Sequence, residues 1–469
     1  MSPSIFPTTT NDREHSRRYW QVIFFVLIVA TGLRGALAFF NREANDNHYE
    51  VVQLILDGRS DLTMRDCHEC FHPKLFYHAC AVLIRALGFT NEGSQIVAGQ
   101  LLNSVAGVIT LVLVLAAIHW SQLLGKWKLW VFSLIALNPR IIAINGQLSN
   151  DSFAILFATA AIFSTLLLLR RPTLWLGVAT QVMLACALMT KGTTWVVAIA
   201  IMIVFFVRAL RDEIKQSSRL FAILYAVSTV NSFVSVQLAG YDFEHYDVYA
   251  NMGRGQPLNL WEKTSVGRPG VQSIVDGYLT FRIVSLLRDP QITNGTAIEQ
   301  LHRTSVWTQL YARANFAQFE QHPPSWVTTD RRVMLVAKLC MILGLVPLMC
   351  LLVGLGRGVF RSIQAWQDCG VPFKDDYSAF LNLLVCLGYI AFIIKFTADY
   401  RDFAAMKLIY MLPGVLPFSV ILLNGMQWVG DRYCRVSIVD RMFQVLLGGL
   451  IVLYVTNILA LVAHLASRS

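Results

Sequence analysis

The chain has 469 residues, of which 55% are hydrophobic and only 14% are charged. Soluble domains usually carry about 25% charged residues, and a water-soluble protein this apolar would expose large adhesive patches. The composition therefore excludes the soluble, disordered and collagen-like classes and leaves a polytopic membrane protein. Lys and Arg number 39 against 29 Asp and Glu. In a membrane protein such an excess of basic residues is first a signal for the orientation of the chain in the membrane, and is not by itself evidence for binding to nucleic acid.

The hydropathy of the chain predicts an all-α bundle of about 11 transmembrane helices, because a helix needs roughly 20 residues to cross the hydrocarbon layer. The first apolar run, Tyr19–Phe40, is too long for a cleavable signal peptide and is predicted to be a retained span. Residues 76–89 include Arg85 and are too few to cross, so they are expected to form an interfacial or a re-entrant helix. The predicted spans are 19–40, 96–118, 128–146, 151–169, 173–190, 193–207, 220–236, 333–355, 377–397, 408–424 and 442–464.

The distribution of Lys and Arg predicts the orientation and the domain organisation. Short connections on one side of the membrane carry most of the basic residues, which places the N-terminus in the cytoplasm. Apolar spacing at 271–287 and 298–319 predicts helices, so the second long loop is expected to be folded. The predicted units are a cytoplasmic N-terminus (1–18), an N-terminal transmembrane module (19–236) with a first extracytoplasmic loop (41–95), a large extracytoplasmic loop (237–332) and C-terminal transmembrane helices (333–469).

The first extracytoplasmic loop contains a candidate catalytic carboxylate. Asp46 and Asn47 precede an amphipathic helical run, and Asn47 followed by Glu50 resembles a capping box. Asp46 or Asn47 could merely cap this helix. Alternatively, the helix dipole keeps Asp46 ionised, and an ionised carboxylate can accept a proton from an attacking hydroxyl. The face that the run is expected to bury consists of His48, Val51, Val52 and Ile55.

A second polar segment of this loop reads Cys67-His68-Glu69-Cys70-Phe71-His72. Two cysteines and two histidines can complete a tetrahedral zinc site, although this spacing is too compressed for a usual zinc finger. In an oxidising compartment the two cysteines could equally form a disulfide or stay free. The segment is otherwise a structural loop or a wall that faces substrate, and the sequence leaves these alternatives open.

Polar residues also interrupt the apolar spans, and most of them fall on the predicted extracytoplasmic side. Ionisable groups at membrane depth are costly and usually functional, and Lys and Arg bind phosphate through charge-assisted hydrogen bonds. For any single cation the alternative is ordinary snorkelling at the end of a span. The residues concerned are Asn150, Asp151, Lys191, Asp399, Arg401 and Lys407, with Tyr410 close behind the last of them.

The order of these motifs resembles the GT-C superfamily of integral-membrane glycosyltransferases. An acidic loop after the first span is followed by H-P-K-L-F-Y, N-P-R…N-D, L-M-T-K-G and K-L-I-Y-M-L-P-G-V-L-P. Within the superfamily, the chain resembles the lipid A aminoarabinose transferases and the protein O-mannosyltransferases. The resemblance runs from about residue 20 to about residue 425.

The resemblance implies a set of catalytic and donor-binding residues. The family's acidic pair Asp-Glu falls on Asn45-Asp46, so Asp46 is expected to be the catalytic base, with Glu43 as the second candidate. Lys191 and Lys407 match the family motifs directly and are expected to bind the donor phosphate. Arg401 and Lys74 are added to this group, although Lys74 is displaced by two positions from the family's lysine. The expected substrate cavity is lined by His48, Tyr49, Glu69, His72, Asn150, Asp151 and Tyr410.

The resemblance further implies an enzyme that moves a monosaccharide from a polyprenyl-phosphate carrier to a hydroxyl of an extracytoplasmic lipid, glycan or protein. A single displacement would invert the sugar. No nucleotide-binding motif is seen in the sequence, no partner nucleic acid is expected, and a divalent metal ion is left open. The alternatives are a transporter or flippase of lipid-linked sugars and a non-catalytic accessory subunit. A bacterial inner membrane is the favoured location, with the endoplasmic reticulum as the alternative.

Overall fold

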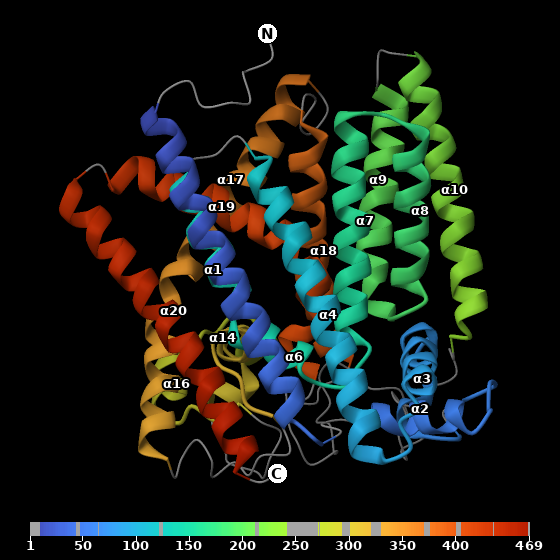
Figure 1. Ribbon diagram of the computed structural model, residues 1–469. Helices are drawn as coiled ribbons and strands as arrows, with labels where there is room; N and C mark the ends of the chain where they lie inside the picture. The colour runs from blue at the N-terminus through green and yellow to red at the C-terminus, as the bar shows by residue number, and fades with distance from the viewer. Residues whose placement is uncertain are drawn as a thin grey trace.

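The computed structural model describes residues 10–43, 47–63, 65–121, 125–211, 215–241, 271, 273–292, 301–319, 330–369, 376–399, 405–434 and 436–467. Over these ranges every regular element is helical (Figure 1). In the N-terminal half the elements are α1 (Thr10–Phe40), α2 (His48–Leu56), η1 (His68–Phe71), α3 (Leu75–Leu87), α4 (Glu92–His119), α5 (Gly125–Ala136), α6 (Pro139–Asn145), α7 (Asp151–Arg170), α8 (Leu174–Leu188), η2 (Gly192–Thr194), α9 (Trp195–Arg211) and α10 (Lys215–Ala239).

Over the same described ranges, the C-terminal half contains the four short helices of the large loop and six further helical elements of the bundle. They are α12 (Ile274–Tyr278), α13 (Ile283–Arg288), η3 (Leu301–Thr304), α14 (Val306–Asn315), α16 (Arg331–Leu343), α17 (Leu345–Cys369), α18 (Tyr377–Asp399), η5 (Leu408–Gly414), α19 (Val415–Tyr433) and α20 (Ser437–Ala466).

The all-helical membrane fold predicted from hydropathy is confirmed. In the described part of the chain, nine helical segments are long and apolar enough to cross a membrane. The predicted span 128–146 is the bent pair of α5 and α6, and the predicted span 173–190 is the shorter α8. Many large apolar side chains of these helices point outward, such as Phe24, Val230 and Val445. In a bilayer that surface contacts lipid, so it needs no protein cover.

The break between α5 and α6 follows from the local sequence. Pro139 opens α6, where its missing N–H costs nothing, and the Asn138 side chain accepts hydrogen bonds from the N–H groups of Arg140 and Ile141 at 3.0 and 3.1 Å. The two helices meet at an angle of 47°. The chain therefore turns inside the bundle instead of crossing it as one straight helix.

The described part of the first long loop, within residues 41–95, folds against the end of the bundle at which α4 begins. Helix α2 packs on α3, and α3 packs on α4 (Figure 1). As predicted, α2 buries His48, Val51, Val52 and Ile55. The predicted capping box is wrong, because Asn47 occupies the N-cap position without a capping hydrogen bond from its side chain. Arg85 donates to the carbonyls of Ile55 and Leu56 at 2.9 and 3.1 Å, so this cation stabilises the end of α2.

The large loop is less regular than its apolar spacing predicts. Instead of one helix over 271–287, the structure has α12 and α13, and Asp289-Pro290 follows the second of them. The predicted helix 298–319 is reduced to η3 and α14, and residues 293–300 lie outside the described ranges. Helix α14 packs against α6 and α16 (Figure 1). Because α6 is short and stops within the bundle, α14 can occupy the space beside it.

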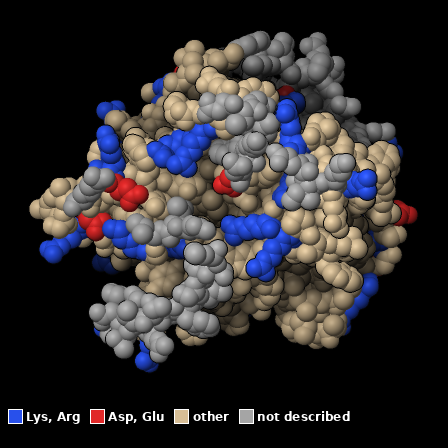
Figure 2. All heavy atoms as spheres, turned by 90° about the horizontal axis from the view of Figure 1, so that it is seen from above, with Lys and Arg blue, Asp and Glu red and all other residues tan. Residues whose placement is uncertain are grey.

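The opposite end of the bundle, where α1 begins, is strongly basic. Figure 2 views this end and shows Lys and Arg far outnumbering Asp and Glu among the described residues. The last turns of helices α7, α9 and α19 contain Arg170, Arg208 and Arg432, respectively. This is the side that the positive-inside rule places in the cytoplasm.

Candidate functional site

A group of polar side chains gathers where the first loop meets the bundle. We call it the polar cluster and define it as His48 of α2, Glu69 of η1, His72, Asp151 at the start of α7, and Lys191 before η2. A backbone hydrogen bond from Leu75 N–H to the Met189 carbonyl, 3.3 Å long, ties the loop to the end of α8. All five members were predicted to be site residues, and the fold brings them together from four separate segments, because Glu69 and His72 lie in and directly after η1.

The centre of the cluster is a buried ion pair. The Lys191 Nζ lies 2.5 Å from the Asp151 Oδ1, and the two side chains are only 9% and 7% exposed. Asp151 is the first residue of α7, where the helix dipole favours a negative charge. The Lys191 ammonium also lies 5.9 Å from the ring centroid of Tyr410 in η5. Lys191 has three N–H donors, so it can hold Asp151 and still donate to a further anion.

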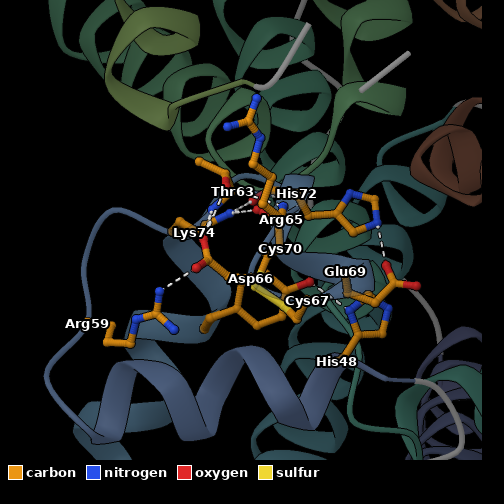
Figure 3. Close-up of a disulfide and its surroundings, with 11 residues drawn as sticks. His48, Arg59, Thr63, Arg65, Asp66, Cys67, Glu69, Cys70, His72 and Lys74 are labelled. Atoms are coloured by element: carbon orange, nitrogen blue, oxygen red, sulfur yellow. Dashed lines mark hydrogen bonds and ion pairs between the residues drawn. A yellow bond between two sulfur atoms is a disulfide. The ribbon is translucent and has the colours of Figure 1, made fainter. Parts of the chain in front are cut away.

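Two histidines border this ion pair. The His72 Nε2 lies 3.0 Å from a carboxylate oxygen of Glu69, and the rings of His72 and His48 stack with centroids 5.7 Å apart (Figure 3). The His48 Nδ1 is 2.6 Å from the Tyr77 hydroxyl oxygen. Burial lowers the pKa of His72 to about 4, and the neighbouring Lys191 and His48 act in the same direction, against the opposing effect of Glu69. His72 is therefore neutral at pH 7, which leaves Lys191 as a fixed positive charge beside an uncharged imidazole.

A disulfide between Cys67 and Cys70 closes the turn that contains Glu69 (Figure 3). Because the two sulfurs are bonded to each other, the cysteines are neither free thiols nor zinc ligands in this structure. Such a bond is typical of an oxidising compartment. Lys74 donates to the carbonyls of Cys70 and His72, the latter at 2.6 Å. Its ammonium thus contacts the backbone of the same turn, and its predicted role in binding the donor phosphate stays a prediction.

The remaining predicted residues occupy varied positions. Tyr49 is buried in the loop's apolar core, and its hydroxyl donates to Gln95 at 2.6 Å. Asn150 donates to the Thr190 carbonyl at 3.2 Å, which joins the start of α7 to the segment before Lys191. Lys407 is half-buried at the N-cap of η5, and Glu43 is exposed. Asp46 and Arg401 lie outside the described residues.

A metal site is not evident among the side chains that the structure describes. Within those ranges no three His, Cys, Asp or Glu side chains form a group that could hold a metal ion. His72 and Glu69 engage each other, and Asp151 engages Lys191.

Sequence analysis missed a buried arginine in the first span. Arg34 is fully buried and donates to Asn145 Oδ1 at 2.8 Å and to the Ala136 carbonyl at 2.9 Å. Asn145 in turn donates to the Ser152 hydroxyl at 3.0 Å, next to Asp151. A charged residue well inside an apolar run is the signal that could have identified it, because such residues are rarely tolerated without a partner.

The fold resembles solved membrane glycosyltransferase structures. The chain aligns with the Archaeoglobus fulgidus oligosaccharyltransferase tethered to an acceptor peptide at a TM-score of 0.52 and 13% identity, over 94% of this chain and 55% of that one. A second match is the Saccharomyces cerevisiae protein O-mannosyltransferase Pmt1–Pmt2 complex bound to its sugar donor, with a TM-score of 0.40 and 14% identity over 49% of this chain and 34% of that one. A third is ArnT from Cupriavidus metallidurans bound to undecaprenyl phosphate, with a TM-score of 0.34 and 13% identity over 89% of this chain and 78% of that one.

The resemblance to the oligosaccharyltransferase is one of fold, and it agrees with the GT-C-like helical bundle that the motif order predicted. The chain spans about a third of the length of the mannosyltransferase and just over half that of the oligosaccharyltransferase.

The family comparison is more particular. Residues 86–245 match the family model for dolichyl-phosphate-mannose-protein mannosyltransferases. This stretch is about a third of the chain and contains both Asp151 and Lys191. No curated protein matches the chain.

Proposed function

We propose that the protein is a membrane glycosyltransferase that moves one monosaccharide from a polyprenyl-phosphate carrier to a hydroxyl of an extracytoplasmic lipid, glycan or protein. The observation that supports this most directly is the buried Lys191–Asp151 pair, which lies within the segment that matches the mannosyltransferase family. The pair also borders the loop in which sequence analysis expects the catalytic base.

Lys191 is proposed to bind the donor phosphate. A polyprenyl phosphate becomes a competent leaving group once its developing charge is stabilised by fixed cations. Lys191 is fixed because Asp151 holds its ammonium and the Tyr410 ring lies beside it. Its low exposure matters because electrostatic attraction weakens in water and strengthens in a dry site. Lys407 precedes η5, the same short helix that contains Tyr410, and is proposed as a second cation.

Asp46 is proposed to be the catalytic base, with Glu43 as the second candidate. Asp46 precedes His48, a member of the polar cluster, by two residues in the sequence. In the proposed step the acceptor hydroxyl oxygen attacks C1 of the sugar, and the bond from C1 to the phosphate oxygen breaks. The hydroxyl proton passes to the Asp46 carboxylate and the electron pair leaves with the polyprenyl phosphate. One displacement of this kind inverts the configuration at C1.

The test is a transfer assay with the purified full chain. The protein is incubated with labelled polyprenyl-phosphate sugars and a membrane extract, and label in the acceptor fraction is measured. Asp46→Asn is expected to lower transfer by about 100-fold or more, the usual contribution of a general base. Asp57→Asn is the matched control, because Asp57 is an exposed carboxylate of the same loop outside the polar cluster.

Two results would contradict the proposal. If Asp46→Asn and Glu43→Gln both transfer sugar as well as the unmodified protein, the assignment of the base is wrong. If no donor supports transfer, yet labelled donor crosses the membrane of vesicles containing the protein, the chain is a transporter of lipid-linked sugars.

A further inference from the structure

A groove of about 310 Å³ opens on the outer surface of the bundle between α17, α19 and α20. Its lining is entirely apolar and includes Met349 and Val353 of α17, Val429 of α19 and Phe443 of α20. A site without polar groups does not hold water. Hydrocarbon is therefore the suitable occupant.

The groove exists because two of its helices touch while the third stands apart. The backbones of α17 and α19 meet at Gly425, where an added Cβ would lie 1.8 Å from the Cys350 carbonyl oxygen. Helix α20 is held at its start by other contacts: Asp440 pairs with Lys126 at 3.0 Å, and Phe443 packs on Trp127 with ring centroids 5.6 Å apart. The shape of the groove is thus set by backbone contact and by α5, not by mobile side chains.

One end of the groove is cationic. Arg357 lies one helical turn after Val353, and its guanidinium carbon is 5.2 Å from the ring centroid of Trp428, the neighbour of Val429. Arg361 on α17 and Arg432 on α19 are exposed near the same end of their helices, where Asp431 is an exposed carboxylate. In Figure 1, α17 and α19 lie toward the end of the bundle at which α1 begins, which is the basic end seen in Figure 2.

We propose that the groove binds an acyl chain of an anionic phospholipid whose phosphate lies at Arg357. The apolar lining accounts for the acyl chain, and the arginines beside its end account for the preference for a negative headgroup. The lipid comes from the leaflet on the basic side of the protein. This site lies toward the opposite end of the bundle from the polar cluster, so it is independent of the proposed transferase activity.

Native mass spectrometry of the purified protein tests the proposal. The protein is titrated separately with phosphatidylglycerol and with phosphatidylcholine of identical acyl chains, and the bound fractions are compared. We expect phosphatidylglycerol to bind about fivefold more tightly, the effect of one basic residue near an anionic headgroup. Arg357→Gln should remove this preference, and Met349→Trp should weaken the binding of both lipids by filling the groove. Arg171→Gln removes an exposed arginine from the same end of the bundle and should change neither value.

Three outcomes would overturn the proposal. The first is equal binding of the two lipids by the unmodified protein. The second is a preference that survives in Arg357→Gln, or that falls to the same extent in Arg171→Gln. The third is a dimer that Met349→Trp dissociates, because the groove would then be an interface between two copies of the chain. Variants that unfold are recognised by loss of the helical circular dichroism signal, and Arg357→Lys and Met349→Phe then replace them. Arg357→Lys keeps the charge and should keep the preference for phosphatidylglycerol. The smaller ring of Met349→Phe should weaken lipid binding less than the ring of Met349→Trp.

Discussion

At the scale of single residues, the most informative pair is Asp151 with Lys191. A buried ion pair contributes little net stability, because removing both charges from water costs nearly as much as their attraction returns. Its presence in a membrane protein is therefore better explained by function than by stability. Lys191 needs a buried position to interact strongly with a phosphate, and the paired Asp151 carboxylate compensates the positive charge buried there.

Replacing Lys191 alone and replacing both members of the pair should have different effects on stability. Lys191→Met should destabilise the protein by about 3–5 kcal/mol, because it leaves Asp151 as an uncompensated buried charge. The double substitution Lys191→Met with Asp151→Leu should recover most of that loss, yet sugar transfer should remain absent. Thermal unfolding in detergent and the transfer assay measure the two effects separately.

A double variant that regained transfer would show that the pair is structural. So would a Lys191→Met protein with unchanged transfer. Lys395 with Asp399 serves as the control, because this exposed i, i+4 pair at 2.5 Å should contribute less than about 1 kcal/mol.

At the scale of elements, the short helix α6 determines where α7 begins. Helix α6 begins at Pro139 because of the Asn138-Pro139 pair. Its last residue, Asn145, contacts both Arg34 and Ser152. Gly107 of α4 has to be a glycine here, because a Cβ would lie 2.2 Å from the Asn145 Oδ1. Arg34 thus connects the first span, through Asn145, to the residue that follows Asp151.

We predict that Arg34→Leu loosens α6 and lowers the stability of the whole protein. The substitution removes charge-assisted hydrogen bonds to Asn145 and to the Ala136 carbonyl, each of which contributes about 1.5–3 kcal/mol. Hydrogen exchange of α6 should accelerate, and the melting temperature in detergent should fall.

Arg17→Leu is the matched control on the same helix, because Arg17 is exposed and should leave both measurements unchanged. Equal protection of α6 in Arg34→Leu and in the unmodified protein would refute the role assigned to Arg34.

At the scale of the whole molecule, charge is distributed between two ends with different chemistry. The end at which α1 begins carries the excess of Lys and Arg (Figure 2), whereas the other end carries the polar cluster and the disulfide. The positive-inside rule places the first end in the cytoplasm. The disulfide agrees with this orientation, because cytosolic thiols are usually kept reduced.

The orientation predicts which cysteines a membrane-impermeant maleimide can reach in sealed, right-side-out vesicles. A cysteine introduced by Asp57→Cys should be labelled directly, whereas one introduced by Arg171→Cys should be labelled only after the vesicles are permeabilised. Both positions are exposed, and label on the unmodified protein gives the background. The reverse pattern would place the polar cluster in the cytoplasm and contradict the proposed function.

Sequence analysis was most successful where a single physical rule decides the outcome. Hydropathy located the spans, and the 3.6-residue period identified the buried face of α2 from His48 to Ile55. It was less successful in the large loop, where apolar spacing predicted long helices and the structure has α12, α13 and α14. It also did not anticipate that Lys74 holds the turn before it, because a lysine's partner depends on the path of the neighbouring backbone.

The sequence by itself predicted the all-helical membrane fold and its spans, because these depend on the transfer of whole segments from water to hydrocarbon. The orientation stays a prediction from local charge counts. Only the tertiary structure decided that Glu69 meets His72, that Cys67 bonds to Cys70 and that Asp151 holds Lys191. The polar cluster and the apolar groove both arise where segments distant in sequence approach each other. Their geometry depends on packing, which no local pattern of residues encodes.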